Sequence, residues 1–146
     1  MKVRNNAGFT AIEIVAVLLI VGVIGAVVVS KLSSSSNVAL ISETETLKSH
    51  LRYAQLRAMS DNVARGIRFN SGSYTLQIDG ADATEVLPSE DSATHSFQTG
   101  VSKTAGATSI AFDRWGSPGA SNQTVTLSTG GTSRTITLTQ NTGFIP

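Results

Sequence analysis

Residues 8–13 read Gly8-Phe9-Thr10-Ala11-Ile12-Glu13, and an apolar run continues from them to Val29. Glu13 is the single charged residue among the 21 residues from Phe9 to Val29. A helix rises about 1.5 Å per residue, so a helix of this length spans about 30 Å, the hydrocarbon thickness of a bilayer. We therefore expect a transmembrane helix at residues 9–30. A carboxylate in such a helix is costly unless it has a partner, which makes Glu13 a candidate functional residue.

The flank before this helix is a short polar leader, residues 1–8 (MKVRNNAG), which carries Lys2 and Arg4. Basic flanks tend to stay in the cytoplasm, so we expect a cytoplasmic N-terminus and a C-terminal domain in the periplasm, held by a single pass through the inner membrane. Two other interpretations share a basic start and an apolar run. One is a secretory signal peptide, whose apolar core is usually about 7–15 residues long and lacks an acid. The other is a plain anchor in which Glu13 is incidental.

Glycine, a bulky apolar residue and an acid four residues later resemble the processing site of type IV prepilins and type II secretion pseudopilins. In that superfamily a membrane peptidase cuts after the glycine and methylates the new N-terminal amine. The resemblance implies cleavage between Gly8 and Phe9, with N-methylation at Phe9. It also implies that Glu13 pairs with the N-terminal amine of a neighbouring subunit during assembly. A buried carboxylate needs a cation, and a free amine in the same apolar layer supplies one.

Composition limits what the remainder of the chain can be. The chain has 146 residues, so one modest domain is left once the apolar segment is set aside. It has no cysteine, which excludes a disulfide scaffold and a thiolate metal site. Of 11 basic residues two lie in the leader, and removing them leaves nine against ten acidic residues. This balance argues against a strongly basic nucleic-acid surface.

Residues 31–62 continue as an amphipathic helix. The serine run Ser33–Ser36 predicts a frayed turn or a hinge at its start. Apolar residues then recur on one face, and this stripe is expected to pack on a β-sheet; it consists of Leu40, Leu47, Leu51, Ala54 and Ala58. The charged residues are interpreted as lying largely off the stripe; they are Glu43, Glu45, Lys48, Arg52 and Arg57. The helix is expected to end near Asp61-Asn62.

From residue 63 the period of the apolar pattern changes to two, which indicates strands over residues 63–146. The segments 67–69 and 74–78 predict one hairpin, and 125–127 with 136–138 predict another across Thr129-Gly130-Gly131-Thr132. Shorter strands are expected near 96–101 and 110–112, with a loop at 79–94 that contains at most a short strand at Glu85–Leu87. The predicted fold class is α+β: a long N-terminal helix, membrane-spanning in its first half, packed on a small antiparallel β domain of about six strands.

Three stretches narrow the resemblance to minor pseudopilins of the GspH/FimT type. They are Leu51-Arg52-Tyr53-Ala54-Gln55-Leu56-Arg57-Ala58-Met59-Ser60, Ile110-Ala111-Phe112-Asp113-Arg114-Trp115-Gly116 and Thr142-Gly143-Phe144-Ile145. In such proteins a strand followed by a turn that ends in glycine, and a glycine near the C-terminus, are recurrent. This second resemblance covers most of residues 38–146.

Other chemistry has little support in the sequence. His50 and His95 fit no metal-ligand spacing, so exposed positions are expected for both. The acids of loop 79–94 favour a solvated loop over a calcium site, because their spacing matches no EF-hand. Trp115 is either a partner-contact residue or a lid over the sheet. Scattered salt bridges are favoured over a phosphate-binding patch for the arginines 52, 57, 65, 68, 114 and 134. We predict no catalytic residue, no metal and no cofactor.

The sequence therefore predicts a structural subunit, a minor pseudopilin or minor pilin of a type II secretion pseudopilus or type IV pilus. The expected partners are other pilin or pseudopilin subunits, the prepilin peptidase and the inner-membrane assembly platform; nucleic acid is not expected. Two alternatives stay open. One is a minor pilin at the filament tip that binds DNA or a secreted substrate, and the other is a major pilin subunit.

Overall fold

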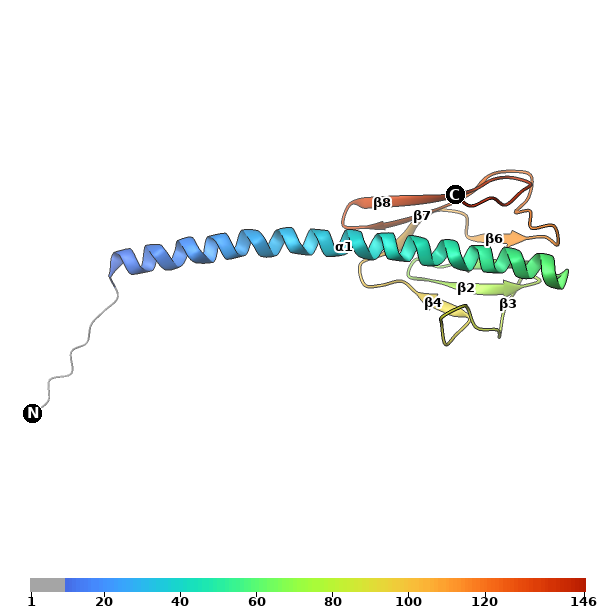
Figure 1. Ribbon diagram of the computed structural model, residues 1–146, viewed down its shortest axis with the longest axis horizontal. Coiled ribbons are helices and arrows are strands. Elements are labelled where there is room, and N and C mark those ends of the chain that lie inside the picture. Colours follow the sequence, from blue (N-terminus) through green and yellow to red (C-terminus); the bar gives the residue numbers. More distant parts are fainter. Residues whose placement is uncertain (1–9) are drawn as a thin grey trace, which may run out of the picture. The chain divides into compact units, whose positions relative to one another are not determined.

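The computed structural model describes the backbone of residues 10–146 and the side chains of these residues except 26–35. Within this range one helix, α1, spans Ala11–Asp61 (Figure 1). It ends where predicted, because Asn62 adopts a left-handed conformation with φ of 58°. The chain divides into two compact units, Met1–Ser35 and Ser36–Pro146.

The serine run does not interrupt α1. The helical assignment continues through Ser33–Ser36, so the frayed turn expected there is absent. Serine has only a modest intrinsic cost in a helix, which apolar neighbours on both sides can offset. The boundary between the two compact units falls directly after Ser35.

The first β-sheet is antiparallel and has the order β3-β2-β1-β6, with β4 also paired to β2. Its strands are β1 (Arg65–Phe69), β2 (Ser73–Ile78), β3 (Ala81–Asp82), β4 (Thr94–Ser96) and β6 (Ser109–Phe112). The predicted β1–β2 hairpin is confirmed, and Ile67 lies opposite Leu76. The short strand expected at Glu85–Leu87 is not formed, and β3 pairs with the end of β2 instead.

The second sheet is also antiparallel, with the order β5-β7-β8. Its strands are β5 (Ser102–Gly106), β7 (Gln123–Thr129) and β8 (Thr132–Leu138). The predicted β7–β8 hairpin is confirmed, and Gly130 and Gly131 form its turn with φ of 53° and 85°. Positive φ at both central residues is the requirement of the turn that suits twisted strands. The described residues thus contain eight strands in two sheets, where about six were expected.

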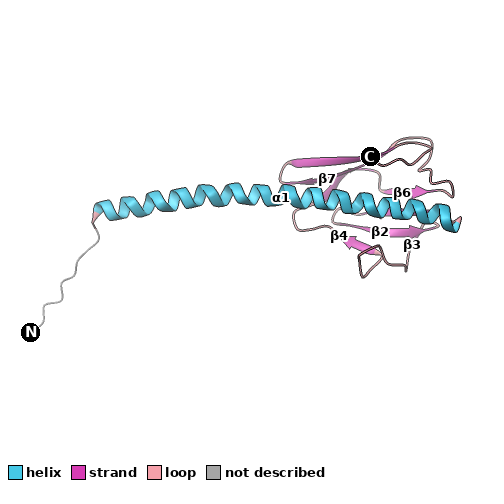
Figure 2. Cartoon of the chain, viewed as in Figure 1, coloured by secondary structure: helices cyan, strands magenta, loops and turns pink. Residues whose placement is uncertain are grey.

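One hydrophobic core joins the helix to both sheets. The predicted stripe Leu40, Leu47, Leu51, Ala54 and Ala58 is buried throughout. Inward side chains of both sheets complete the core, among them Ile67, Leu76, Ile110, Phe112, Val125, Leu127, Ile136 and Leu138. Figure 2 shows the C-terminal part of the helix lying along the strands. The stripe is therefore the seam between the helix and the sheets, as predicted.

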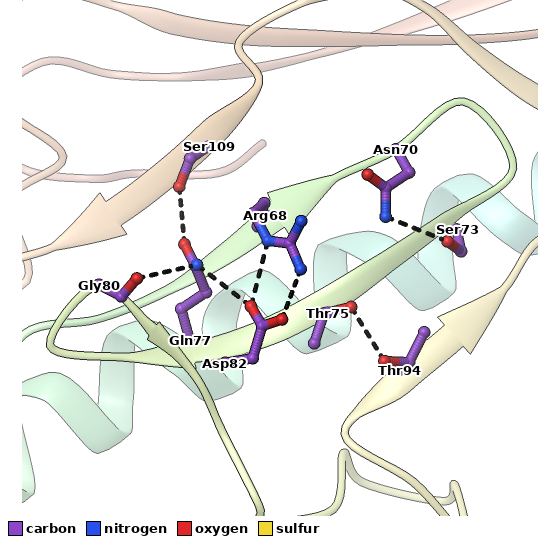
Figure 3. Close-up of polar contacts among 9 residues, drawn as sticks. All are labelled: Arg68, Asn70, Ser73, Thr75, Gln77, Gly80, Asp82, Thr94 and Ser109. Carbon is purple, nitrogen blue, oxygen red and sulfur yellow. Dashed lines mark hydrogen bonds and ion pairs between the residues drawn. The ribbon is translucent and has the colours of Figure 1, made fainter.

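The outer face of the first sheet is polar, because apolar and polar residues alternate along its strands and the apolar ones face the core. Arg68 on β1 donates to Asp82 on β3, with 3.1 Å between Nε and Oδ1. Gln77 accepts a hydrogen bond from Ser109 on β6, and the hydroxyls of Thr75 and Thr94 lie 2.9 Å apart (Figure 3). These cross-strand contacts involve all five strands of the sheet, on the face opposite the core.

Candidate functional site

The N-terminal end of α1 carries the residue singled out first by the sequence. Thr10 caps the helix, and its hydroxyl accepts a hydrogen bond from the Glu13 backbone N–H at 3.3 Å. Glu13 lies in the first turn, with its side chain exposed beside Ile14, Val17 and Leu18. A carboxylate is favourable at this position because the helix dipole is positive there. Gly8 and Phe9 lie outside the described residues.

The helix after Glu13 exposes apolar side chains in every direction. From Ile12 to Ile24 the large apolar residues are each 52–78% exposed. Gly22 and Gly25 face open space in the single chain. Over the residues that the structure describes, no helix is long and apolar enough to cross a membrane. The hydration of a helix segment that is apolar on all sides is nonetheless unfavourable. Contact between this segment and another apolar surface is therefore favoured.

Three polar residues of α1 are also buried: Glu43 and His50, each 2% exposed, and Thr44, 3% exposed. The interpretation of Glu43 as lying off the buried stripe was wrong, and so was the expectation that His50 is exposed. Glu43, Leu47, His50 and Ala54 follow one another at spacings of four, three and four, which places them on one helix face. That spacing is the signal that could have identified both residues.

His50 links α1 to β2 and to the acidic loop. Its Nε2 lies 3.0 Å from the Pro88 carbonyl oxygen, and its Nδ1 lies 2.7 Å from the Tyr74 hydroxyl. A carbonyl can only accept, so Nε2 carries the proton and neutral Nδ1 accepts from Tyr74. Burial lowers the pKa of His50 below its ordinary value and raises the pKa of Tyr74 far above its own. The pair is therefore neutral and positions the loop on the helix.

His95 on β4 joins two carboxylates. Its Nε2 lies 2.8 Å from Glu43 Oε2 and its Nδ1 lies 2.5 Å from Glu90 Oε1. Burial alone lowers the pKa of His95, but the hydrogen bonds to Glu43 and Glu90 outweigh burial and raise the pKa above its ordinary value. The ring also stacks on Tyr74, with 4.9 Å between centroids. A carboxylate oxygen accepts hydrogen bonds, so both contacts are satisfied when both ring nitrogens carry a proton, and in that form His95 compensates the buried Glu43 carboxylate.

The acidic loop is held by cations from the rest of the domain. Glu90 contacts His95, Asp82 contacts Arg68, and Glu85 lies between Arg65 and Arg57. The hydrogen bond from Arg65 lowers the pKa of Glu85. These three carboxylates have separate partners, and the described residues contain no group of three or more His, Cys, Asp or Glu placed to hold a metal ion. The solvated loop favoured from the sequence is instead partly tied to the fold.

The arginines do not gather at one place. Arg57 and Arg65 share Asp61 and Glu85, and Arg68 pairs with Asp82 on the outer face of the first sheet. Arg52 donates to the Ile145 carbonyl at 3.0 Å. Scattered pairs of this kind agree with the preferred interpretation of the arginines. They do not form the phosphate-binding patch that a DNA-binding tip would require.

Trp115 is not a lid over the sheet, because its side chain is 75% exposed. It lies in the turn after β6, where the Asp113 carboxylate accepts hydrogen bonds from the backbone N–H groups of Trp115 at 2.8 Å and Ser117 at 2.9 Å. The Arg114 guanidinium carbon lies 5.5 Å from the centre of the Trp115 ring. This exposure excludes one of the two predicted roles of Trp115, a lid over the sheet. The other role, contact with a partner, stays a prediction.

The fold has a counterpart among solved structures. It is similar to the crystal structure of the type IV minor pilin FimU of Pseudomonas aeruginosa strain PAO1, with a TM-score of 0.56 and 20% sequence identity. The alignment covers 73% of this chain and 86% of that chain. The likeness is one of fold: in this chain too, the C-terminal part of a long helix packs on antiparallel sheets through one hydrophobic core.

The family follows from the sequence of the folded domain. The family model of type II transport protein GspH matches residues 43–143, and the chain belongs to that family. A search of curated proteins found no match. The chain is accordingly a structural subunit of the minor pseudopilin or minor pilin kind, as predicted, and proteins of these families assemble with other pilin subunits. Proteins of these families are structural rather than catalytic.

Proposed function

We propose that the chain is a filament subunit made as a precursor and cut between Gly8 and Phe9, with N-methylation at Phe9. Residues 9–30 then hold it in the inner membrane before assembly, with the N-terminus cytoplasmic and the folded domain periplasmic. Membership of the GspH family supports this pathway, and so does the processing-site pattern of residues 8–13. The prepilin peptidase and the inner-membrane assembly platform are the further partners that the proposal requires.

The observation that carries the proposal is the exposure of apolar side chains on all sides of α1 between Ile12 and Ile24. Burying a side chain of this size is worth about 1.5–3 kcal/mol, so leaving ten of them in water is strongly unfavourable. Lipid covers such a surface before assembly, and the helices of neighbouring subunits cover it in a filament. Repeated head-to-tail contacts of this kind generate a helical filament.

Glu13 gives that association its specificity in the proposal. It is the single charged residue of an otherwise apolar surface, and the structure places it exposed in the first helical turn. An apolar contact around it strengthens any pairing with a cation, since the local dielectric is low. The N-terminal amine of a neighbouring subunit is the cation proposed.

The test is Glu13→Ala, followed by separation of sheared filaments from membranes. The variant is expected to be cleaved after Gly8 and to stay in the membrane fraction, because the carboxylate is needed for docking and not for processing. Glu45→Ala is the matched control, since Glu45 is an exposed acid further along the same helix that contacts only Lys48 among the described residues. Normal recovery of Glu13→Ala in filaments would contradict the proposed role of this residue.

A further inference from the structure

Large exposed apolar side chains gather where α1, the turn after β6 and the C-terminal turn meet. Leu56 is 62% exposed, Met59 43%, Trp115 75% and Phe144 64%. Leu56 and Phe144 line one surface depression together with Arg52 and Gln55. Gly116, the neighbour of Trp115, lies so near Met59 that a Cβ atom there would be 2.9 Å from the Met59 sulfur. We call this surface the clamp face and define it as Arg52, Leu56, Met59, Arg114, Trp115 and Phe144.

The clamp face is held in place by Gln55. Its side-chain amide donates to the carbonyl oxygen of Gly116 at 2.8 Å and to those of Thr142 and Gly143 at 3.2 Å each. The two turns also meet directly, because a Cβ atom on Gly143 would lie 2.3 Å from the Gly116 oxygen. Only glycine fits there, and its φ of 63° favours glycine as well. An ordered surface loses little conformational entropy when a partner binds.

The cations of the clamp face are available to a partner. Arg57, Arg65 and Arg68 each contact a carboxylate, whereas Arg52 and Arg114 contact none within residues 10–146. Arg52 binds the Ile145 carbonyl and Arg114 lies against Trp115, so both guanidinium groups are positioned at the edge of the apolar surface. Exposed aromatic residues and arginines of this kind provide most of the energy in many protein interfaces.

We propose that the clamp face binds a segment of a different protein in which an apolar side chain is flanked by carboxylates. The apolar group would contact Leu56 and Phe144, and the carboxylates would pair with Arg52 and Arg114. The proposal deepens the proposed function, on which it rests, by assigning a partner surface to this subunit. Nucleic-acid bases stack on aromatic side chains, whereas Leu56 and Met59 are not aromatic and suit the apolar side chains of a protein partner better.

The experiment uses the full chain in the cells that make it, with photoreactive benzoylphenylalanine in place of Leu56 or of Phe144. Cross-linked peptides are sequenced by mass spectrometry. Both positions are expected to capture the same segment of one other protein, with at least two Asp or Glu residues close to the cross-linked site. The matched control carries benzoylphenylalanine in place of Val86, an apolar residue 52% exposed on the acidic loop. It is expected not to capture that segment.

Charge reversal then tests the arginines. Arg52→Glu and Arg114→Glu, each combined with the photoreactive group at Phe144, are expected to lower the cross-linking yield about fivefold, because they place like charges opposite each other. Arg134→Glu is the control, since Arg134 is exposed on β8 and has no carboxylate partner in the described part of the chain. Gln55→Ala is expected to lower the yield as well, with both turns still folded.

Several results would overturn the inference. They are a captured segment that is basic or neutral, a nuclease-sensitive product, a product with a second copy of this chain, and a yield that Arg52→Glu and Arg114→Glu leave unchanged. Measurements on the same cells distinguish failure of the clamp-face proposal from failure of the proposed function. A chain that is cleaved after Gly8 and recovered in filaments without the predicted cross-link overturns the clamp-face proposal alone, whereas a chain that is never cleaved contradicts the proposed function.

Discussion

At the scale of single residues, the buried polar group around His95 decides how the acidic loop is held. Glu43 and His50 come from the helix, Tyr74 and His95 from two strands, and Glu90 from the loop. A buried carboxylate such as Glu43 is costly without compensation, and His95 supplies the compensating charge. The contribution of His95 to the stability of the domain therefore depends on the protonation of its imidazole.

We predict that His95→Gln is more destabilising at pH 6 than at pH 9. The raised pKa of folded His95 means that its stabilisation is fully present below the unfolded value of about 6.5 and is lost as the pH rises through the folded pKa. The loss at pH 6 should be about 2 kcal/mol, the scale of charge-assisted hydrogen bonds. Urea unfolding of both proteins at each pH gives the difference.

His50 has the opposite pH dependence. Because its pKa is lowered in the folded domain, its contribution to the free energy of unfolding falls as the pH falls. Both the wild type and His95→Gln contain His50, but the charge of His95 helps to lower the pKa of His50, so the difference between them reports His95 together with its effect on His50. Ser96→Ala, at an exposed neighbouring position, is the control and should show no such trend. A difference that is constant from pH 6 to pH 9 would show that His95 is neutral in the folded domain.

The residue scale is also where the sequence was least informative. The histidines were predicted to be exposed because neither has metal-ligand spacing, but burial is decided by helix period, and Glu43 and His50 share the period of Leu47. His95 lies on a three-residue strand whose burial depends on the loop packed beside it. No local pattern reports such a contact, because it is made between segments far apart in the chain.

At the scale of elements, β1 is held between β2 and β6 at a point of close approach. A Cβ atom on Gly66 would lie 2.3 Å from the Ile110 carbonyl oxygen and 2.7 Å from the Ala111 Cα atom. Gly66 pairs with Ala111 in the register of β1 and β6. The glycine thus allows the two strands to approach, which a larger residue would prevent.

Gly66→Ala should therefore reduce the free energy of unfolding by about 1–3 kcal/mol, the usual cost of overpacking. Thermal or urea unfolding measures the change. Gly72→Ala in the β1–β2 turn is the matched control, since a Cβ atom there meets nothing within 4 Å. Equal stabilities of the two variants would mean that β1 and β6 adjust freely at Gly66.

The helix offers a second comparison between matched residues. Leu47 is 0% exposed in the seam between α1 and the sheets, whereas Leu56 is 62% exposed on the clamp face. Leu47→Ala should reduce the free energy of unfolding by about 2–5 kcal/mol. Leu56→Ala should change it by less than about 0.5 kcal/mol. A large effect of Leu56→Ala would show that this side chain packs in the domain and is not available to a partner.

The elements with strong periodicity were predicted correctly, and those without it were not. The stripe of α1, its end at Asn62 and the hairpins β1–β2 and β7–β8 follow from local patterns and turn residues. β3 has two residues, β4 has three, and the five residues of β5 include one glycine and no large apolar side chain. Such strands form because a neighbouring strand supplies hydrogen-bond partners for their backbone. The local sequence pattern contains no information about that neighbour.

At the scale of the whole molecule, the chain combines two units with opposite surface chemistry. In Ser36–Pro146 the apolar side chains form a buried core. In the unit before it, the described apolar side chains from Ile12 to Ile24 remain exposed in the single chain. The second unit has the properties of a folded domain, and the first needs a further apolar surface. The proposed assembly into a filament would supply that surface.

The central claim is that this chain enters the pilin pathway, and the most direct measurement is the intact mass of the protein extracted from membranes with and without the prepilin peptidase. With the peptidase present, we expect a chain that begins at Phe9 and carries one added methyl group. Without it, the leader should remain attached. A chain that still begins at Met1 in cells with the peptidase, or one cut near Ser30 as a secretory signal would be, would contradict the account.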